Sequence, residues 1–167
     1  MIHLFLFLLF VLGPCVGSFL NVVSIRWPEN RALSGRSHCA RCSRQLRWFD
    51  LLPIVSFIIL RGRCHFCHER ISWQYPLVEV LTGLLFVFVG WYFFAAGIPL
   101  SIISYFNLAL QLFFVSLFLV IAVTDFRSYL ILDRLLIILL LGVAVYLVKS
   151  VFFLSPDVYI YSFLIPR

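Results

Sequence analysis

Four cysteines in one polar segment carry the clearest chemical signal of this 167-residue sequence. They form two pairs of identical spacing, Cys39-x2-Cys42 and Cys64-x2-Cys67. A Cys-x2-Cys pair holds two sulfur ligands close together, and two such pairs supply the four thiolates of a tetrahedral zinc site. The spacing therefore predicts a structural zinc site formed by Cys39, Cys42, Cys64 and Cys67.

Two other uses of these cysteines are compatible with the sequence. Cys64-His65-Phe66-Cys67-His68 matches the Cys-x-x-Cys-His pattern of haem attachment, although that pattern leaves the first pair without a role. Reversible redox chemistry is the second alternative. We expect the neighbouring arginines to favour the thiolate form of these cysteines.

Carboxylates in or beside apolar segments are the second group of candidates, because an ionised group is costly to place in a membrane. Glu79 lies one turn into an apolar segment, and Asp125 ends another, with Asp133 eight residues further on. The structural alternatives are that Glu79 pairs with an arginine and that the aspartates flank a short turn. On a continuous helix Asp125 and Asp133 would be about 12 Å apart, whereas an aspartic-protease pair shares a proton at about 3 Å.

The composition places these residues in an integral membrane protein. Hydrophobic residues make up 63% of the chain and charged residues 12%, which excludes both an ordinary soluble domain and a disordered chain. Four apolar segments are long enough to cross a hydrocarbon core of about 30 Å, namely 1–25, 76–97, 100–124 and 135–154. The first is interpreted as an uncleaved helix because it lacks a cationic start, and Cys15 as a small core residue.

The net charge of +6 lies entirely in the segment 26–75, which contains nine arginines and three acidic residues. Beside a membrane span, such a charge indicates a cytoplasmic loop. The amino terminus and the 97–99 turn would then lie outside. We therefore expect the lipid bilayer, and no nucleic acid, as a partner of this segment. The apolar run 51–60 within it is too short to span, and we interpret it as interfacial or re-entrant.

The predicted fold class is therefore all-α. The chain would form a polytopic bundle of about four membrane spans. A cytoplasmic four-Cys loop of zinc-binding type would connect the first two spans.

The order of motifs between residues 13 and 90 resembles the amino-terminal domain of bacterial type IV prepilin peptidases, the leader peptidase/N-methyltransferases. The residues that carry the resemblance are Gly17-Ser18-Phe19-Leu20-Asn21-Val22-Val23, Arg26-Trp27-Pro28, Ser37-His38 with the two cysteine pairs, Leu60-Arg61-Gly62-Arg63, Ile71-Ser72-x2-Tyr75-Pro76-Leu77-Val78-Glu79 and Leu81-Thr82-Gly83-Leu84-Leu85-Phe86. Thr124-Asp125-x7-Asp133 is similar to the first aspartate motif of the family. The resemblance implies an amino-terminal domain over 1–97 and an incomplete peptidase domain over 98–167. It also implies a multi-pass protein of the bacterial inner membrane.

The resemblance also implies an activity. Members of the family cleave the short basic leader of prepilins or pseudopilins at the cytoplasmic membrane face. They then methylate the new amino terminus with S-adenosylmethionine. Asp125 matches the first catalytic aspartate, the four cysteines match the zinc loop, and Gly62 matches a glycine linked to methyl transfer. Glu79, in the matching run, is a second methyl-transfer candidate.

Two departures from the family pattern concern the peptidase site. Leu132 stands where the family has proline, and no GxGDxK motif with the second catalytic aspartate occurs in these 167 residues. An aspartic mechanism needs one carboxylate as base and one as acid. We therefore expect a truncated peptidase-like protein whose peptidase site is incomplete.

Other interpretations stay open beside it. In one, the chain keeps methyltransferase activity or substrate binding through the zinc loop. In another, a homodimer pairs two copies of Asp125 across a two-fold axis. The alternative function is not enzymatic: the chain would be a non-catalytic zinc-binding membrane protein that binds pilin or secretion-system partners.

Overall fold

The computed structural model describes residues 2–95, 101–128 and 141–142. The chain divides into two compact units, Met1–Leu132 and Asp133–Arg167. Only residues 141–142 of the second unit are described, so Asp133 and most of the fourth predicted span lie outside the described residues. The fold below is that of the first unit.

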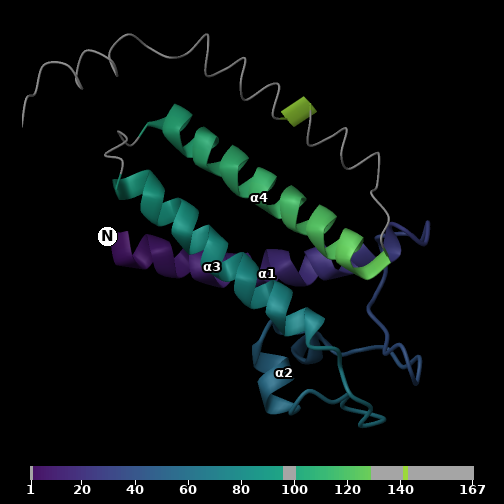
Figure 1. Cartoon of the computed structure of the whole chain (residues 1–167). Helices are drawn as coiled ribbons and strands as arrows, with labels where there is room; N and C mark the ends of the chain where they lie inside the picture. Colours follow the sequence, from purple (N-terminus) through teal and green to yellow (C-terminus); the bar gives the residue numbers. More distant parts are fainter. Residues whose placement is uncertain (1, 96–100, 129–140, 143–167) are drawn as a thin grey trace, which may run out of the picture. The chain divides into compact units, whose positions relative to one another are not determined.

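The first unit is helical wherever the structure describes regular elements (Figure 1). Helices α1 (Ile2–Arg26), α3 (Gln74–Ala95) and α4 (Ile102–Ser128) are long, and the 3-10 turn η1 (Trp48–Leu51) and helix α2 (Val55–Ile59) lie in the loop between α1 and α3. The described residues contain no strand beyond isolated bridges. The prediction of an all-α membrane protein is confirmed for this part of the chain.

Three of these helices are long and apolar enough to cross a membrane: α1, α3 and the Ile102–Phe126 part of α4. They correspond to the first three predicted spans, with shifted ends. Helix α3 begins two residues before Pro76, which is possible because an amide N–H in the first turn has no helical partner to lose. Helix α4 continues past Thr124 to Ser128, since no glycine or proline stops it. Asp125 therefore lies within this helix and not after its end.

Helices α1 and α3 approach each other through glycine. A Cβ atom added to Gly13 of α1 would lie 2.5 Å from the Cα atom of Gly83 on α3, and one added to Gly17 would lie 2.8 Å from Oγ1 of Thr82. Small residues permit such close backbone packing, and van der Waals packing is one of the forces that hold helices together in lipid. Helix α4 packs against both helices (Figure 1).

Cys15 does not belong to this interface, which corrects the prediction of a core residue. Gly13 and Gly17 on either side of it are buried, whereas Cys15 is exposed. Two residues correspond to a rotation of about 200° around a helix. Cys15 therefore points away from the face that packs on α3.

Buried polar side chains join the end of α1 to the start of α3. Asn21 is fully buried, and its Nδ2 donates to the carbonyl oxygens of Gly17, at 3.3 Å, and Tyr75, at 3.2 Å. Thr82 is also fully buried, and its hydroxyl donates to the Val78 carbonyl at 2.6 Å. These bonds satisfy polar groups that have no water partner inside a bilayer. The bond from Asn21 to Tyr75 joins the two helices at the base from which the cysteine loop projects.

Candidate metal centre and carboxylates

The first cysteine pair lies in a tight hairpin turn. The Cys39 N–H donates to the Arg44 carbonyl at 3.0 Å, and the Ser43 N–H donates back to the Cys39 carbonyl at 3.0 Å. An antiparallel bridge between His38 and Gln45 closes the turn. Ser43, directly after the second cysteine, has a φ of 54°, which lets the chain reverse within a few residues.

The second pair lies in an equivalent turn. The Cys64 N–H donates to the Glu69 carbonyl at 2.8 Å, and the His68 N–H donates to the Cys64 carbonyl at 3.0 Å. A bridge between Arg63 and Arg70 closes it, and His68 has a φ of 56°. The same local sequence spacing therefore produces the same backbone geometry twice, as the repeated Cys-x2-Cys pattern predicts.

The two turns bring all four sulfur atoms together. The Sγ atoms of Cys39, Cys42, Cys64 and Cys67 lie within 4.8 Å of one another, and those of Cys39 and Cys67 are 3.8 Å apart. Four sulfurs around zinc, each at about 2.3 Å, would be about 3.8 Å apart along every edge of the tetrahedron. All four are free thiols. The donor set and its spacing therefore fit a zinc ion.

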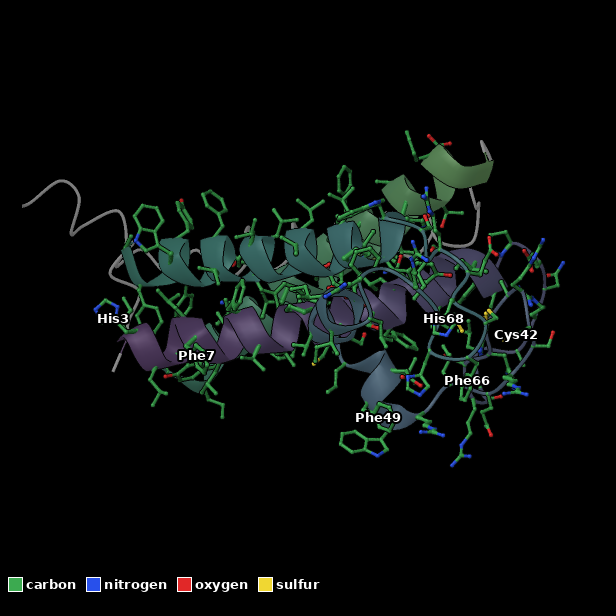
Figure 2. The ribbon with its side chains drawn as sticks, turned by 90° about the horizontal axis from the view of Figure 1, so that it is seen from below. His3, Phe7, Cys42, Phe49, Phe66 and His68 are labelled. Atoms are coloured by element: carbon green, nitrogen blue, oxygen red, sulfur yellow. The ribbon has the colours of Figure 1, made fainter. Side chains whose placement is uncertain are left out.

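The histidines of the loop lie outside this group of possible ligands in the described chain. His65 instead packs edge-on against the rings of Phe49 and Phe66, at centroid distances of 6.2 and 5.3 Å. Figure 2 shows His68 and Cys42 at the same end of the loop. Haem attachment would use only Cys64 and Cys67, whereas the convergence of both pairs is the arrangement that a metal ion needs.

The crowding of thiols changes the acidity of Cys67. The Glu69 backbone N–H lowers its pKa, but desolvation and the thiols of Cys64, Cys42 and Cys39 raise it to about 12. A metal cation among the sulfurs has the opposite effect, because a coordinating thiol is deprotonated. We expected the neighbouring arginines to favour the thiolate form, but the pKa of Cys67 is raised and its neutral thiol is favoured.

The arginines nearest the second turn bind an aromatic ring instead. The guanidinium carbons of Arg44 and Arg47 lie 5.5 and 5.4 Å from the centre of the Phe66 ring. Both distances are in the range of cation–π contacts. These side chains therefore cover the turn between Cys64 and Cys67 from outside.

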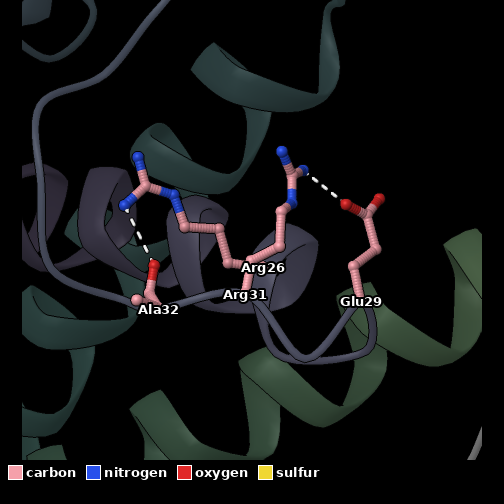
Figure 3. Close-up of polar contacts among 4 residues, drawn as sticks. All are labelled: Arg26, Glu29, Arg31 and Ala32. Atoms are coloured by element: carbon pink, nitrogen blue, oxygen red, sulfur yellow. Dashed lines mark hydrogen bonds and ion pairs between the residues drawn. The ribbon is translucent and has the colours of Figure 1, made fainter.

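The start of the loop is held by Arg26, the last residue of α1 (Figure 3). Its Nη1 donates to three successive carbonyl oxygens at 3.1–3.4 Å, those of Ala32, Leu33 and Ser34. Arg31 forms an ion pair with Glu29 beside it. One guanidinium thus satisfies several backbone acceptors and shapes the chain that leads to the first cysteine pair.

Glu79 connects this loop to the helix bundle. Its side chain is buried on α3, and Oε2 accepts a hydrogen bond of 2.7 Å from the backbone N–H of Ile54, directly before α2. The Ser18 side chain is a second polar neighbour of this carboxyl group. These partners differ from the arginine that the structural alternative expected.

Gly62 lies at the other end of α2. It has a φ of 68°, and a Cβ atom added to it would lie 3.0 Å from Cζ of Phe57 on α2. The two methyl-transfer candidates, Gly62 and Glu79, are therefore far apart in sequence but both contact the α2 segment. The sequence did not predict a role for Ile54. This residue acts through its backbone N–H, and no sequence pattern indicates a positive φ at the position between Pro53 and α2.

Asp125 is exposed in the last turns of α4, next to the buried Thr124. Because α4 runs antiparallel to α3, its carboxyl end lies at the same end of the bundle as the cysteine loop (Figure 1). Asp133, the other aspartate of this motif, lies outside the described residues. The structure thus places one candidate carboxylate on the loop side of the bundle.

Residues 11–93 match the family model of the Bacterial Peptidase A24 N-terminal domain. The match includes most of α1, the whole cysteine loop and most of α3. Residues 11–93 are therefore a domain of this family, and the resemblance seen over residues 13–90 is confirmed.

Curated relatives extend the similarity. The prepilin leader peptidase/N-methyltransferase of Myxococcus xanthus is 54% identical over 84 residues, which cover 50% of this chain and 25% of the relative. The protein of the same name from Bacillus subtilis is 38% identical over 138 residues, covering 80% of this chain and 50% of the relative, so this match includes α4. That from Neisseria gonorrhoeae is 36% identical over 132 residues, 64% of this chain and 44% of the relative. The chain spans a quarter to a half of the length of these relatives. No solved structure matches.

Proposed function

We propose that this chain is the membrane-embedded, zinc-bearing part of a prepilin leader peptidase/N-methyltransferase that processes type IV prepilins or pseudopilins. The observation that carries the proposal is the coincidence of two findings in one segment. Residues 11–93 match the peptidase A24 amino-terminal domain, and the same segment brings four cysteine sulfurs within 4.8 Å of one another. The names of the relatives supply the activity.

Zinc has a structural role in this proposal. Cys39, Cys42, Cys64 and Cys67 would hold it, and it would supply a cross-link between two turns that share few buried apolar contacts. Among the described loop residues 27–73, Cys64 has the one side chain that is buried. A closed site of four thiolates leaves no position for a substrate, as in other structural zinc sites.

In the peptidase reaction, a carboxylate removes a proton from water while a second carboxyl group assists at the scissile carbonyl. We assign the first of these carboxylates to Asp125. Its exposure at the loop end of α4 supports this assignment, because a leader segment can reach it there. The second carboxylate is not assigned to a described residue. A second copy of the chain, with its own Asp125, is one source of it in this proposal.

For methyl transfer, we propose S-adenosylmethionine as the donor and the new pilin amino terminus as the acceptor. Gly62 and Glu79 are the candidate residues of this chain. Since the Glu79 carboxylate is buried and bonded to the Ile54 amide, we assign it a positioning role: it holds α2, against which Gly62 packs. The basic loop would lie in the cytoplasm, and the amino terminus outside.

The experiment is processing of a type IV prepilin co-expressed with this chain in bacterial membranes that lack their own peptidase. Mass spectrometry reports leader removal and amino-terminal methylation separately. Where a second copy of the chain completes the peptidase site, Asp125→Asn should abolish the leader removal that the unmodified chain performs. It should leave methylation of a pre-cleaved pilin intact. Glu69→Gln, in the loop, is the matched control and should process normally. Leader removal by Asp125→Asn at the unmodified rate would contradict the role of Asp125.

The alternative of a non-catalytic protein that binds pilins is not favoured by the relatives, whose names describe processing enzymes. It predicts a complex with the prepilin but neither a shortened nor a methylated product. The same mass-spectrometric experiment distinguishes the two functions.

A further inference from the structure

The segment from η1 to α2 exposes large apolar side chains. Trp48 is 76% exposed, Ile58 68% and Ile59 73%, and Trp73, just before α3, is 76% exposed. Every other large apolar side chain that is exposed in the described loop 27–73 also lies in this segment, namely Phe49, Leu51, Leu52 and Val55. Soluble surfaces rarely carry so contiguous an apolar patch without a partner. We call residues 48–59 together with Trp73 the apolar hairpin.

The apolar hairpin lies at the level of the helix bundle and not beyond it. The Ile54 amide is bonded to Glu79, one turn inside the span-length helix α3. The Phe57 ring packs on Trp73 with centroids 4.9 Å apart. Figure 2 shows Phe49 beside the body of α1, whereas Cys42 lies farther out along the same direction. The patch also continues onto α3, where Leu77 is 67% exposed.

The segment is too short to cross a bilayer. Helix α2 has five residues, which correspond to about 7.5 Å. No charged residue occurs between Leu51 and Leu60. Arg47 and Asp50 precede this run and Arg61 and Arg63 follow it, so the flanking charge is net positive. An apolar body with tryptophans at its edges and arginines around it is the composition of an interfacial segment.

We propose that the apolar hairpin inserts into the headgroup–acyl boundary of the membrane leaflet that borders the cysteine loop. Anionic phospholipid is the partner that fits both its apolar side chains and its flanking arginines. The anchor would hold the two cysteine turns at a constant height above the leaflet. A basic prepilin leader fits less well, because the arginines would repel it, and a second copy would bring like charges together.

The test uses single-tryptophan variants of the whole chain in vesicles of phosphatidylcholine and phosphatidylglycerol. Replacing Trp27, Trp73 and Trp91 by Phe leaves Trp48 as the fluorophore. Lipids brominated high on the acyl chain should quench most of the Trp48 emission, and aqueous acrylamide should quench little of it. Lipids brominated near the chain end should quench it less, because the insertion is about 5–10 Å deep.

Two matched variants calibrate the measurement. Leu84→Trp, in a background with all four native tryptophans replaced by Phe, places the probe at an exposed position near the middle of α3, and deeply brominated lipid should quench it. Ala40→Trp in a background with all four native tryptophans replaced by Phe places the probe between Cys39 and Cys42, and acrylamide should quench it strongly.

Trp48 emission that acrylamide quenches and brominated lipid does not would overturn the proposal. Emission protected from both quenchers would also overturn it and would identify a protein contact at the hairpin. Neither result bears on prepilin processing, so the outcome is independent of the proposed activity.

Discussion

The backbone amide of Ile54 donates a 2.7 Å hydrogen bond to the buried carboxylate of Glu79. The bond joins residues 25 positions apart and fixes the start of α2 against α3. Ile54 has a φ of 63°, a conformation that is rare for a β-branched residue and costs about 1–3 kcal/mol. A hydrogen bond to a charged group, worth about 1.5–3 kcal/mol, offsets this strain.

Replacement of Glu79 should therefore loosen α2. We expect Glu79→Ala to destabilise the protein by about 2–4 kcal/mol, because it leaves the Ile54 amide buried without an acceptor. Glu79→Gln retains an acceptor oxygen and should cost less than half as much. Thermal unfolding in detergent measures the difference, and limited proteolysis within 52–62 locates it. If the carboxylate acts in methyl transfer itself, Glu79→Gln will lose methylation completely although it loses much less stability than Glu79→Ala.

Gly62 tests the other end of α2. Gly62→Ala should destabilise the loop by about 1–2 kcal/mol through its left-handed backbone and by more through contact with Phe57, 3.0 Å from the new Cβ. Gly35→Ala is the control, because Gly35 also has a positive φ, 102°, but has no neighbour within 4 Å of the added Cβ. Phe57→Leu should restore part of the stability of Gly62→Ala and none of Gly35→Ala. Equal costs for the two alanine variants would contradict the contact.

Zinc content tests the metal centre. We expect about one zinc ion per purified chain and its loss in Cys39→Ser or Cys64→Ser. Cys15→Ser should keep its zinc, because Cys15 is exposed on α1, away from the cysteine turns. Elemental analysis gives the metal content, and hydrogen exchange of 37–71 reports whether the turns stay folded. A metal-free Cys64→Ser loop with native protection would show that zinc is not structural.

The raised pKa of Cys67 determines how zinc binding responds to pH. With a pKa of about 12, this thiol is protonated at neutral pH when the metal is absent. Binding must therefore release its proton, and apparent zinc affinity should fall as the pH falls. For the metal-free loop, the quantity that depends on pH is its stability, and this falls as the pH rises. Its neutral thiol contributes stability below the unfolded pKa of 9.0, and this stability is lost as the pH rises towards 12. Titration calorimetry in buffers of different ionisation enthalpy counts the protons released.

Local sequence alone determined the membrane class, the approximate positions of α1, α3 and α4 and the pairing of cysteines. Bilayer thickness dictates the length of an apolar span, and a Cys-x2-Cys turn needs only neighbouring residues. Only the tertiary structure decided that Cys15 faces outward, that Ile54 bonds to Glu79 and that Gly62 packs on Phe57. These features depend on contacts between α1, α2 and α3, and the apolar run 51–60 has no periodicity that would predict which helix receives it. The chain thus encodes its apolar span-length helices and its cysteine turns locally, whereas the position of the loop relative to these helices arises from packing.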